Sequence, residues 1–176
     1  MKTYFCILFS SMLFSCTQSD IQLPDPIRPV FSYEKRVCID SAFDQEDVKD
    51  ITFSIIRWNA VAEKTGVWMK IDKTDCELNI DRFDILSNLI DFCNDKRALA
   101  CANHIGGNQI LVMRNRIESQ FKLRGVVLHE LGHILGARHT ESGKGLMTLE
   151  YSGYRFQFID QETINQIIKY QKVKTK

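Results

Sequence analysis

The sequence has few prolines, no excess of charge of either sign and no long hydrophobic run. The three prolines, Pro24, Pro26 and Pro29, all lie near the N-terminus, and they exclude a regular helix or a central strand there. The 23 basic and 22 acidic residues are nearly balanced and form no basic stripe, so nucleic acid is not expected as a partner. The longest mostly apolar stretch, Tyr4–Phe14, is too short to span a bilayer as a helix.

This apolar stretch predicts export. It follows Lys2 and ends in Leu13, Phe14, Ser15 and Cys16, a sequence that resembles the bacterial lipobox, although Phe14 stands where a small residue is usual. Residues 1–15 are therefore interpreted as a lipoprotein-type signal peptide, with Cys16 as the lipidated residue. The alternative is a plain signal peptide in which Cys16 is incidental.

Residues 16–34 then form a flexible, lipid-anchored tether. Thr17 follows the cysteine in place of the Asp that retains lipoproteins in the inner membrane, which favours an outer-membrane lipoprotein of the cell envelope. Without lipidation, the protein would be periplasmic or secreted. The remaining residues, 35–176, suffice for one domain with a real core but not comfortably for two.

Three of the four histidines lie in one segment, where His129, His133 and His139 follow the pattern H-E-x-x-H-x-x-G-x-x-H. A helix of 3.6 residues per turn places His129 and His133 on one face, where both imidazoles reach one metal. Gly136 can adopt the left-handed conformation that ends the helix and turns His139 back toward the same metal. Five specified residues at fixed offsets arise by chance in about 1 chain in 10⁵ of this size.

Three imidazoles predict one catalytic Zn²⁺, because they leave a fourth position open to water, whereas structural zinc sites have four protein ligands. Glu130 follows the first ligand and is the candidate general base for that water. This set of residues predicts metal-assisted hydrolysis of an amide.

A methionine, Met147, follows His139 by eight positions in a glycine-containing segment. A motif of this kind followed by a methionine resembles the metzincin zinc peptidases, and the short offset is similar to small bacterial matrixin-like catalytic domains. The resemblance implies that Met147 forms a hydrophobic floor under the ligands in a Met-turn; the alternative is an ordinary core methionine. Thr140, Thr148 and Leu149 depart from the residues usual at their positions, which leaves the branch open.

The resemblance implies an α/β (α+β) fold of the zincin/metzincin type, expected as a monomer. Its parts would be a twisted, mostly parallel five-stranded sheet with an antiparallel edge strand, an active-site helix, the Met-turn and a C-terminal helix.

The local patterns agree with this fold. Strands are predicted at 35–40, 67–71, 77–81, 98–105 and 109–113, the last two as a hairpin turning at Gly106 and Gly107. Helices are predicted from the N-cap Asp44 to about Thr65, over 123–135, and after Asp160. Residues 84–97 suit either a short helix or a loop.

Four cysteines remain in the exported part, namely Cys38, Cys76, Cys93 and Cys101, and an even number suggests two disulfides. Three pairings are possible, and free buried thiols are the alternative. The resemblance favours Cys38 with Cys76, on neighbouring strands of the metzincin sheet, and Cys93 with Cys101 would close a short loop.

In the resembling fold the edge strand of the hairpin binds an extended peptide, so a polypeptide is the expected substrate and a zinc endopeptidase the expected activity. A catalytically silent, lipid-anchored zinc protein that captures ligands is one alternative, and a zinc hydrolase of a small amide is another. Glu130 argues against the first, since a binding module has no use for a general base.

Overall fold

The computed structural model describes residues 33–85, 91–140, 145–148 and 158–174. The predicted signal peptide, Cys16 and all but the last two residues of the predicted tether lie outside these ranges. Among the described residues, no helix combines the length and the apolar character needed to cross a membrane.

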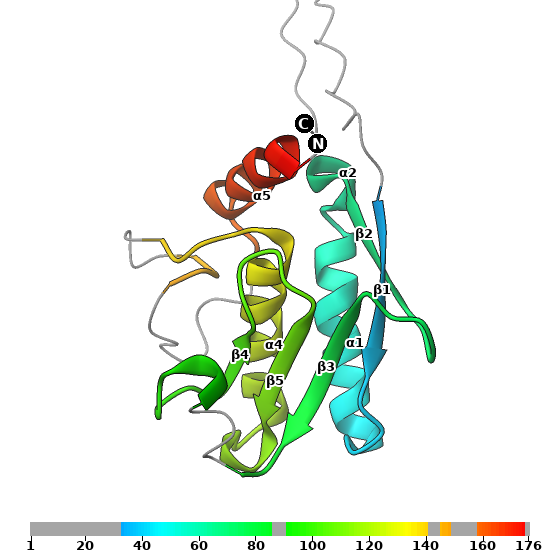
Figure 1. Ribbon diagram of the computed structural model, residues 1–176, viewed down its shortest axis with the longest axis vertical. Coiled ribbons are helices and arrows are strands. Elements are labelled where there is room, and N and C mark those ends of the chain that lie inside the picture. The colour runs from blue at the N-terminus through cyan, green and yellow to red at the C-terminus, as the bar shows by residue number, and fades with distance from the viewer. Residues whose placement is uncertain (1–32, 86–90, 141–144, 149–157, 175–176) are drawn as a thin grey trace, which may run out of the picture.

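Five strands form one sheet in the order β2-β1-β3-β5-β4. They are β1 (Tyr33–Ile39), β2 (Val67–Ile71), β3 (Leu78–Phe83), β4 (Ala100–Ala102) and β5 (Gln109–Met113). All neighbouring pairs are parallel except β4 with β5, where Cys101 lies opposite Leu111 (Figure 1). The predicted mostly parallel sheet with an antiparallel edge strand is confirmed. However, β1 begins at Tyr33, so the first strand starts two residues before the predicted position 35 and includes the last two residues of the predicted tether.

The helices are α1 (Gln45–Asn59), α2 (Ala62–Thr65), α4 (Gln120–Leu135) and α5 (Gln161–Lys174), with a 3-10 turn at Arg114–Arg116. Residues 91–93 are also helical. The predicted caps are present, because the Asp44 side chain accepts from Asp47 N, and the Asp160 side chain accepts from Thr163 N. Ser119 caps α4 in the same way, which starts that helix three residues earlier than predicted.

Helix α1 ends earlier than the predicted boundary at Thr65. Its apolar stripe continues to Ala62, but the helix stops after Asn59. A second short helix, α2, follows and is capped by Gly66, which has φ 74°. The carboxamide of Asn59 donates to Met69 O at 2.8 Å and accepts from Met69 N at 2.9 Å. Asn59 thereby satisfies the backbone of the edge strand β2, a tertiary contact that helix propensity does not register.

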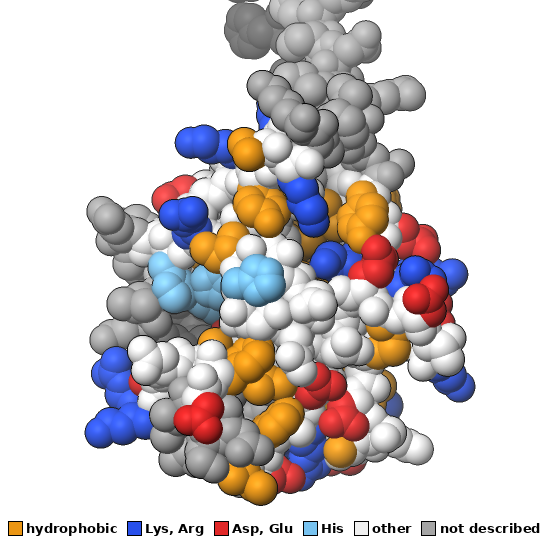
Figure 2. All heavy atoms as spheres, in the orientation of Figure 1, with side chains coloured by type: hydrophobic (Ala, Val, Ile, Leu, Met, Phe, Trp, Pro, Cys, Tyr) orange, Lys and Arg blue, Asp and Glu red, His pale blue; other side chains and the backbone are white. Residues whose placement is uncertain are grey.

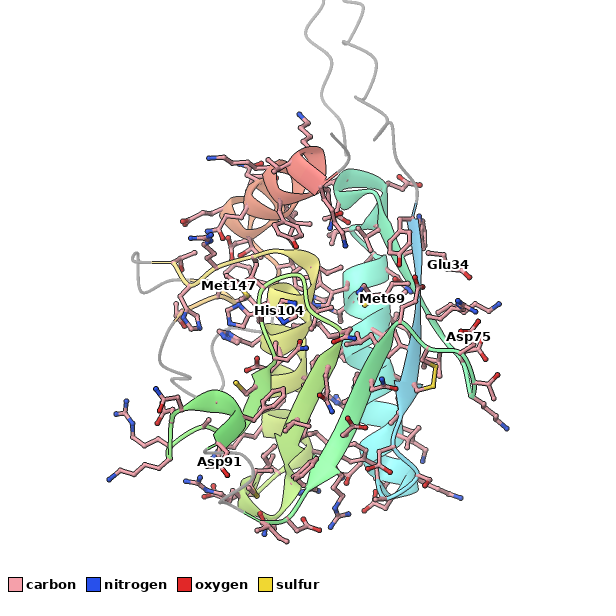
Figure 3. The ribbon with its side chains drawn as sticks, viewed as in Figure 1. Glu34, Met69, Asp75, Asp91, His104 and Met147 are labelled. Carbon is pink, nitrogen blue, oxygen red and sulfur yellow. A yellow bond between two sulfur atoms is a disulfide. The ribbon has the colours of Figure 1, made fainter. Side chains whose placement is uncertain are left out.

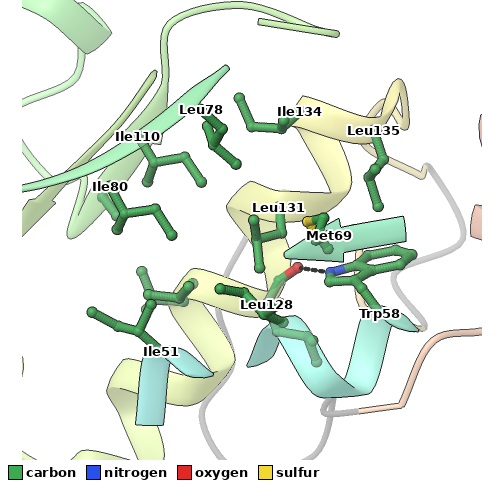
Figure 4. Packing of buried hydrophobic residues seen from close by; sticks show 14 of the residues in the cluster. Ile51, Trp58, Met69, Leu78, Ile80, Ile110, Leu128, Leu131, Ile134 and Leu135 are labelled. Atoms are coloured by element: carbon green, nitrogen blue, oxygen red, sulfur yellow. Dashed lines mark hydrogen bonds between the residues drawn. The ribbon is translucent and has the colours of Figure 1, made fainter. Parts of the chain in front are cut away.

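Helices α1 and α4 pack side by side on one face of the sheet, and the main core lies between the two layers (Figures 1 and 4). Trp58 of α1 is 1% exposed, and its indole nitrogen donates to Leu128 O at 2.9 Å. Two buried carboxylates of α1 also hold the start of α4, because Asp50 pairs with Arg124 and Asp47 accepts from Gln120 Nε2 at 3.0 Å. These contacts fix the segment that immediately precedes His129.

One disulfide joins Cys38 of β1 to Cys76, just before β3. The second pairing is wrong as a bond, because Cys93 and Cys101 are free thiols. The two side chains nevertheless belong to one cluster, since both pack against Leu111 and Met113 of β5. The short sequence separation predicted their proximity, which is necessary for a disulfide but not sufficient.

Candidate active site

Helix α4 carries His129, Glu130 and His133 and ends one turn later. Gly136 has φ 114°, in the left-handed region, and its N–H donates to Gly132 O and His133 O. A side chain is strained in this conformation, which explains the glycine at the end of the motif. The next three residues return His139 to the exposed face of α4 beside the other two histidines.

The three histidine side chains present Nε2 atoms to one point. His139 Nε2 lies 3.2 Å from His129 Nε2 and 3.1 Å from His133 Nε2. Two nitrogens bound tetrahedrally to one zinc at about 2.05 Å lie roughly 3.3 Å apart. The separation and the chemistry of the donors therefore fit a zinc ion held by His129, His133 and His139.

Backbone carbonyls orient two of these rings. His129 Nδ1 lies 2.8 Å from Leu146 O, and His133 Nδ1 lies 2.9 Å from Ala137 O. Because a carbonyl only accepts, each Nδ1 carries the proton and each Nε2 keeps its lone pair for a metal.

Burial also keeps the three imidazoles neutral. It lowers the pKa of His129 to about 4, and it lowers the pKa values of His133 and His139 as well. A neutral imidazole is the form that binds zinc, so the site does not have to lose protons to accept a metal near neutral pH.

Glu130 of α4 is buried against the edge strand β4. Its Oε2 accepts a hydrogen bond from Ala102 N at 2.8 Å, and only 8% of the residue is exposed. Burial raises the pKa of Glu130, while the neighbouring His133 and the Ala102 N–H act in the opposite direction. The carboxylate is thus held in one place, next to the three imidazoles.

Met147 is fully buried, and no space remains between its sulfur and Gly132, which directly precedes His133 on α4. A Cβ at Gly132 would lie 2.5 Å from Met147 Sδ. The Met147 carbonyl accepts from Thr140 N at 2.7 Å, and Thr140 directly follows the third histidine. The methionine segment is therefore tied to the segment that carries His139, as a Met-turn requires.

A cleft of about 940 Å³ runs along the histidines. Residues 97–102 form one wall, α4 and the His139 segment form the other, and His104 lies on the loop that joins β4 to β5 (Figure 3). Histidine side chains gather at the surface on this face of the molecule (Figure 2). The three histidines therefore lie along a cleft that opens to solvent, with His139 the most exposed of them.

The edge strand β4 pairs with β5 through alternate residues. Leu99 O accepts from Met113 N, and Asn103 N donates to Gln109 O. In an antiparallel ladder the residues between these have their N–H and C=O groups on the opposite side. The backbone groups of Ala100 and the carbonyl of Ala102 accordingly face the cleft.

The structure brings the three candidate ligands together and places Glu130, Gly136 and Met147 around them. Cys93 and Cys101 also line the cleft, whereas Cys38 and Cys76 lie away from it. The pattern missed Ala102, whose role depends on its backbone and leaves no side-chain signal. It also missed the cleft position of His104, for which the hairpin turn at Gly106 was the available clue.

Two comparisons place these features among known proteins. The matrixin family model matches residues 30–170, most of the chain. The crystal structure of archaemetzincin from Methanopyrus kandleri has a similar fold, with a TM-score of 0.53 and 15% identity, over 79% of this chain and 96% of that one. The chain belongs to the matrixin family, and residues 33–174 contain a metzincin-like zinc metallopeptidase domain.

Proposed function

We propose that the protein is a zinc endopeptidase that cleaves extended polypeptides. The observation that carries this proposal is the hydrogen bond between Glu130 and Ala102, which joins the candidate general base to the edge strand beside the three histidines. A peptide lying along β4 would pass directly in front of Glu130. A binding protein of the same fold would not need a buried carboxylate there.

The backbone groups of β4 that point away from β5 support a peptide as the substrate. Ala100 N–H, Ala100 C=O and Ala102 C=O face the cleft, so an extended chain can add to the sheet through main-chain hydrogen bonds. The Ala102 N–H is already used by Glu130 and does not contribute. Main-chain recognition of this kind suits a segment within a longer polypeptide better than a small amide.

Bound zinc would lower the pKa of a water molecule and polarise the scissile carbonyl. Glu130 accepts the proton as the water oxygen attacks the carbonyl carbon, and it then delivers that proton to the leaving amine. The raised pKa of Glu130 suits a group that must gain and lose the same proton. Ala102 N–H holds the carboxylate in place during both transfers.

The test compares purified wild-type protein with Glu130→Gln on a diverse peptide pool, with cleavage products identified by mass spectrometry. Glutamine keeps an oxygen that can accept from Ala102 N–H but cannot act as the base, so the rate should fall by about 10²–10⁴-fold. Glu118→Gln is the matched control, because Glu118 is an exposed carboxylate paired with Lys122 outside the cleft. A zinc chelator should abolish the wild-type activity.

Two outcomes contradict the proposal. Cleavage that is equal in wild type and Glu130→Gln, and insensitive to chelator, excludes the mechanism. Zinc binding without cleavage of any peptide by the wild-type protein favours the capture of ligands in the cleft.

We also propose that Cys16 anchors the enzyme to a membrane of the cell envelope by lipidation. The apolar stretch that ends at Cys16, followed by a proline-containing segment, supports this location. Cys16→Ser should move the protein from the membrane fraction to the soluble fraction. An unmodified Cys16 in the mature wild-type protein would exclude the anchor.

A further inference from the structure

Helix α5 contacts the chain on both sides of the turn that brings His139 to the site. Gln166 Oε1 accepts from Arg138 N at 2.7 Å, directly before His139. Gln171 Nε2 donates to Leu135 O at 3.0 Å, at the last residue of α4. Side chains of α5 thus hydrogen-bond one carbonyl that the end of α4 leaves without a partner within the helix, and one N–H of the turn that follows.

Tyr170, one helical turn after Gln166, packs between two loops that meet near the histidines. A Cβ at Gly136 would overlap the Tyr170 ring, and a Cβ at Gly106 would overlap its phenolic oxygen. Gly106 N donates to His133 O at 2.8 Å, so the loop between β4 and β5 also touches the end of α4 here. Both glycines have positive φ, and the room they leave is filled by Tyr170.

The N-terminus of α5 holds the methionine segment. Asp160 Oδ2 accepts from Leu146 N at 3.2 Å, and the Leu146 carbonyl lies 2.8 Å from His129 Nδ1. Asp160 also caps α5 through Thr163 N at 2.8 Å. Helix α5 therefore contacts Leu146, which orients His129, at its N-terminal end, and Arg138, which precedes His139, further along.

His139 depends on such supports more than the other ligands do. His129 and His133 lie on α4, whose backbone is fixed by its own hydrogen bonds and by α1, whereas His139 is exposed and lies beyond the helix end. Its backbone is held on one side by Thr140 N, which donates to Met147 O, and on the other by the bond from Arg138 N to Gln166.

We propose that Gln166 is a positioning residue for the third zinc ligand, acting from α5 through the backbone of Arg138. The inference rests on the proposed zinc-dependent function. Gln166 does not contact the three candidate ligands directly. Its hydrogen bond with Arg138 N fixes the position of the neighbouring His139 and so of the His139 imidazole. Changes to groups that orient metal ligands typically lower metal affinity by about 10–100-fold.

The test measures zinc affinity by competition with a chromophoric chelator in purified protein. Gln166→Leu keeps a similar volume and removes the acceptor, and zinc binding should weaken by about 10-fold or more. Gln166→Glu retains an acceptor oxygen for Arg138 N and should restore most of the affinity. The matched control is Asn165→Leu, which removes an exposed carboxamide from the same helix, where its oxygen accepts from Gln161 Nε2 at 3.0 Å.

Cobalt(II) substitution gives a second readout that does not depend on catalysis. Loss of an ordered third imidazole should weaken the visible absorption bands of four-coordinate cobalt in Gln166→Leu but not in Asn165→Leu. Urea unfolding of the metal-free variants checks that both fold with similar stability.

Equal zinc affinity and equal cobalt spectra in Gln166→Leu and Asn165→Leu would overturn the inference while leaving the proposed function intact. The same follows if Gln166→Glu is as impaired as Gln166→Leu, since packing and not the acceptor would then matter. A wild-type protein that binds no zinc would overturn the proposed function, and this inference with it.

Discussion

The close approach of Gly132 to Met147 gives a quantitative prediction about the floor of the site. An added Cβ would lie 2.5 Å from Met147 Sδ, 3.1 Å from Met147 Cε and 3.3 Å from Trp58 Cζ2. Met147 is fully buried, so its sulfur can move away only by displacing other core side chains. Gly132→Ala should therefore force strain into the segment beneath the ligands.

Two effects oppose each other in Gly132→Ala. Alanine stabilises a helix interior by about 1 kcal/mol relative to glycine. Overpacking a filled core costs about 1–3 kcal/mol, and a contact of 2.5 Å with a confined sulfur belongs in the upper half of that range. We expect the free energy of unfolding to fall by about 1–2 kcal/mol in the wild-type background.

The Met147→Ala background removes the obstacle. Met147→Ala alone should lower the free energy of unfolding by about 2–5 kcal/mol because it opens a cavity. Adding Gly132→Ala should then stabilise the protein by up to about 1 kcal/mol, since only the Trp58 contact remains tight. The coupling energy between the two positions should be about 2 kcal/mol.

Urea unfolding of the four proteins, followed by the fluorescence of the buried Trp58, measures this cycle. Chelator should be present throughout, because bound metal would add its own stabilisation by mass action. The prediction is wrong if Gly132→Ala changes the free energy of unfolding equally, within about 0.5 kcal/mol, in the wild-type and Met147→Ala backgrounds.

Two further predictions concern acid and thiols. Burial lowers the pKa of His129 to about 4, so between pH 6.5 and 4 the unfolded chain binds a proton at this residue that the folded chain does not. The free energy of unfolding of the metal-free protein should therefore fall as the pH drops through this window. Urea titrations at several pH values should show a larger fall for wild type than for His129→Phe. An equal fall in both proteins would contradict the prediction. Alkylation of the mature unfolded protein without reductant, followed by mass spectrometry, should label Cys93 and Cys101 and leave Cys38 and Cys76 unlabelled. Four labelled or four unlabelled cysteines among these would contradict the assignment of one disulfide.

Local patterns predicted the elements whose causes are local. The Asp44 cap and the left-handed Gly136 follow from neighbouring residues, and the core-facing side of α1 follows from the period of its apolar side chains. The three histidines are one such case, because one helical turn and one glycine suffice to bring them together.

Features that depend on distant partners were not predictable in the same way. The break in α1 depends on Asn59 reaching Met69, and the placement of Glu130 depends on the backbone of Ala102, 28 residues away. Backbone donors carry no residue identity, and a carboxamide such as Gln166 looks like any half-exposed helix residue until its partner is known. The candidate metal ligands were therefore predictable from the motif, whereas the contacts that orient them were not.

The disulfide between Cys38 and Cys76 has a consequence for a peptidase that meets other copies of itself. The bond encloses all of α1, α2 and β2 within one covalent loop. A single cut in that loop, by another copy or by any other protease, leaves both fragments attached to the same molecule. The pieces cannot diffuse apart, so Trp58 and Asp50 stay available to α4 and a nicked enzyme can keep its fold.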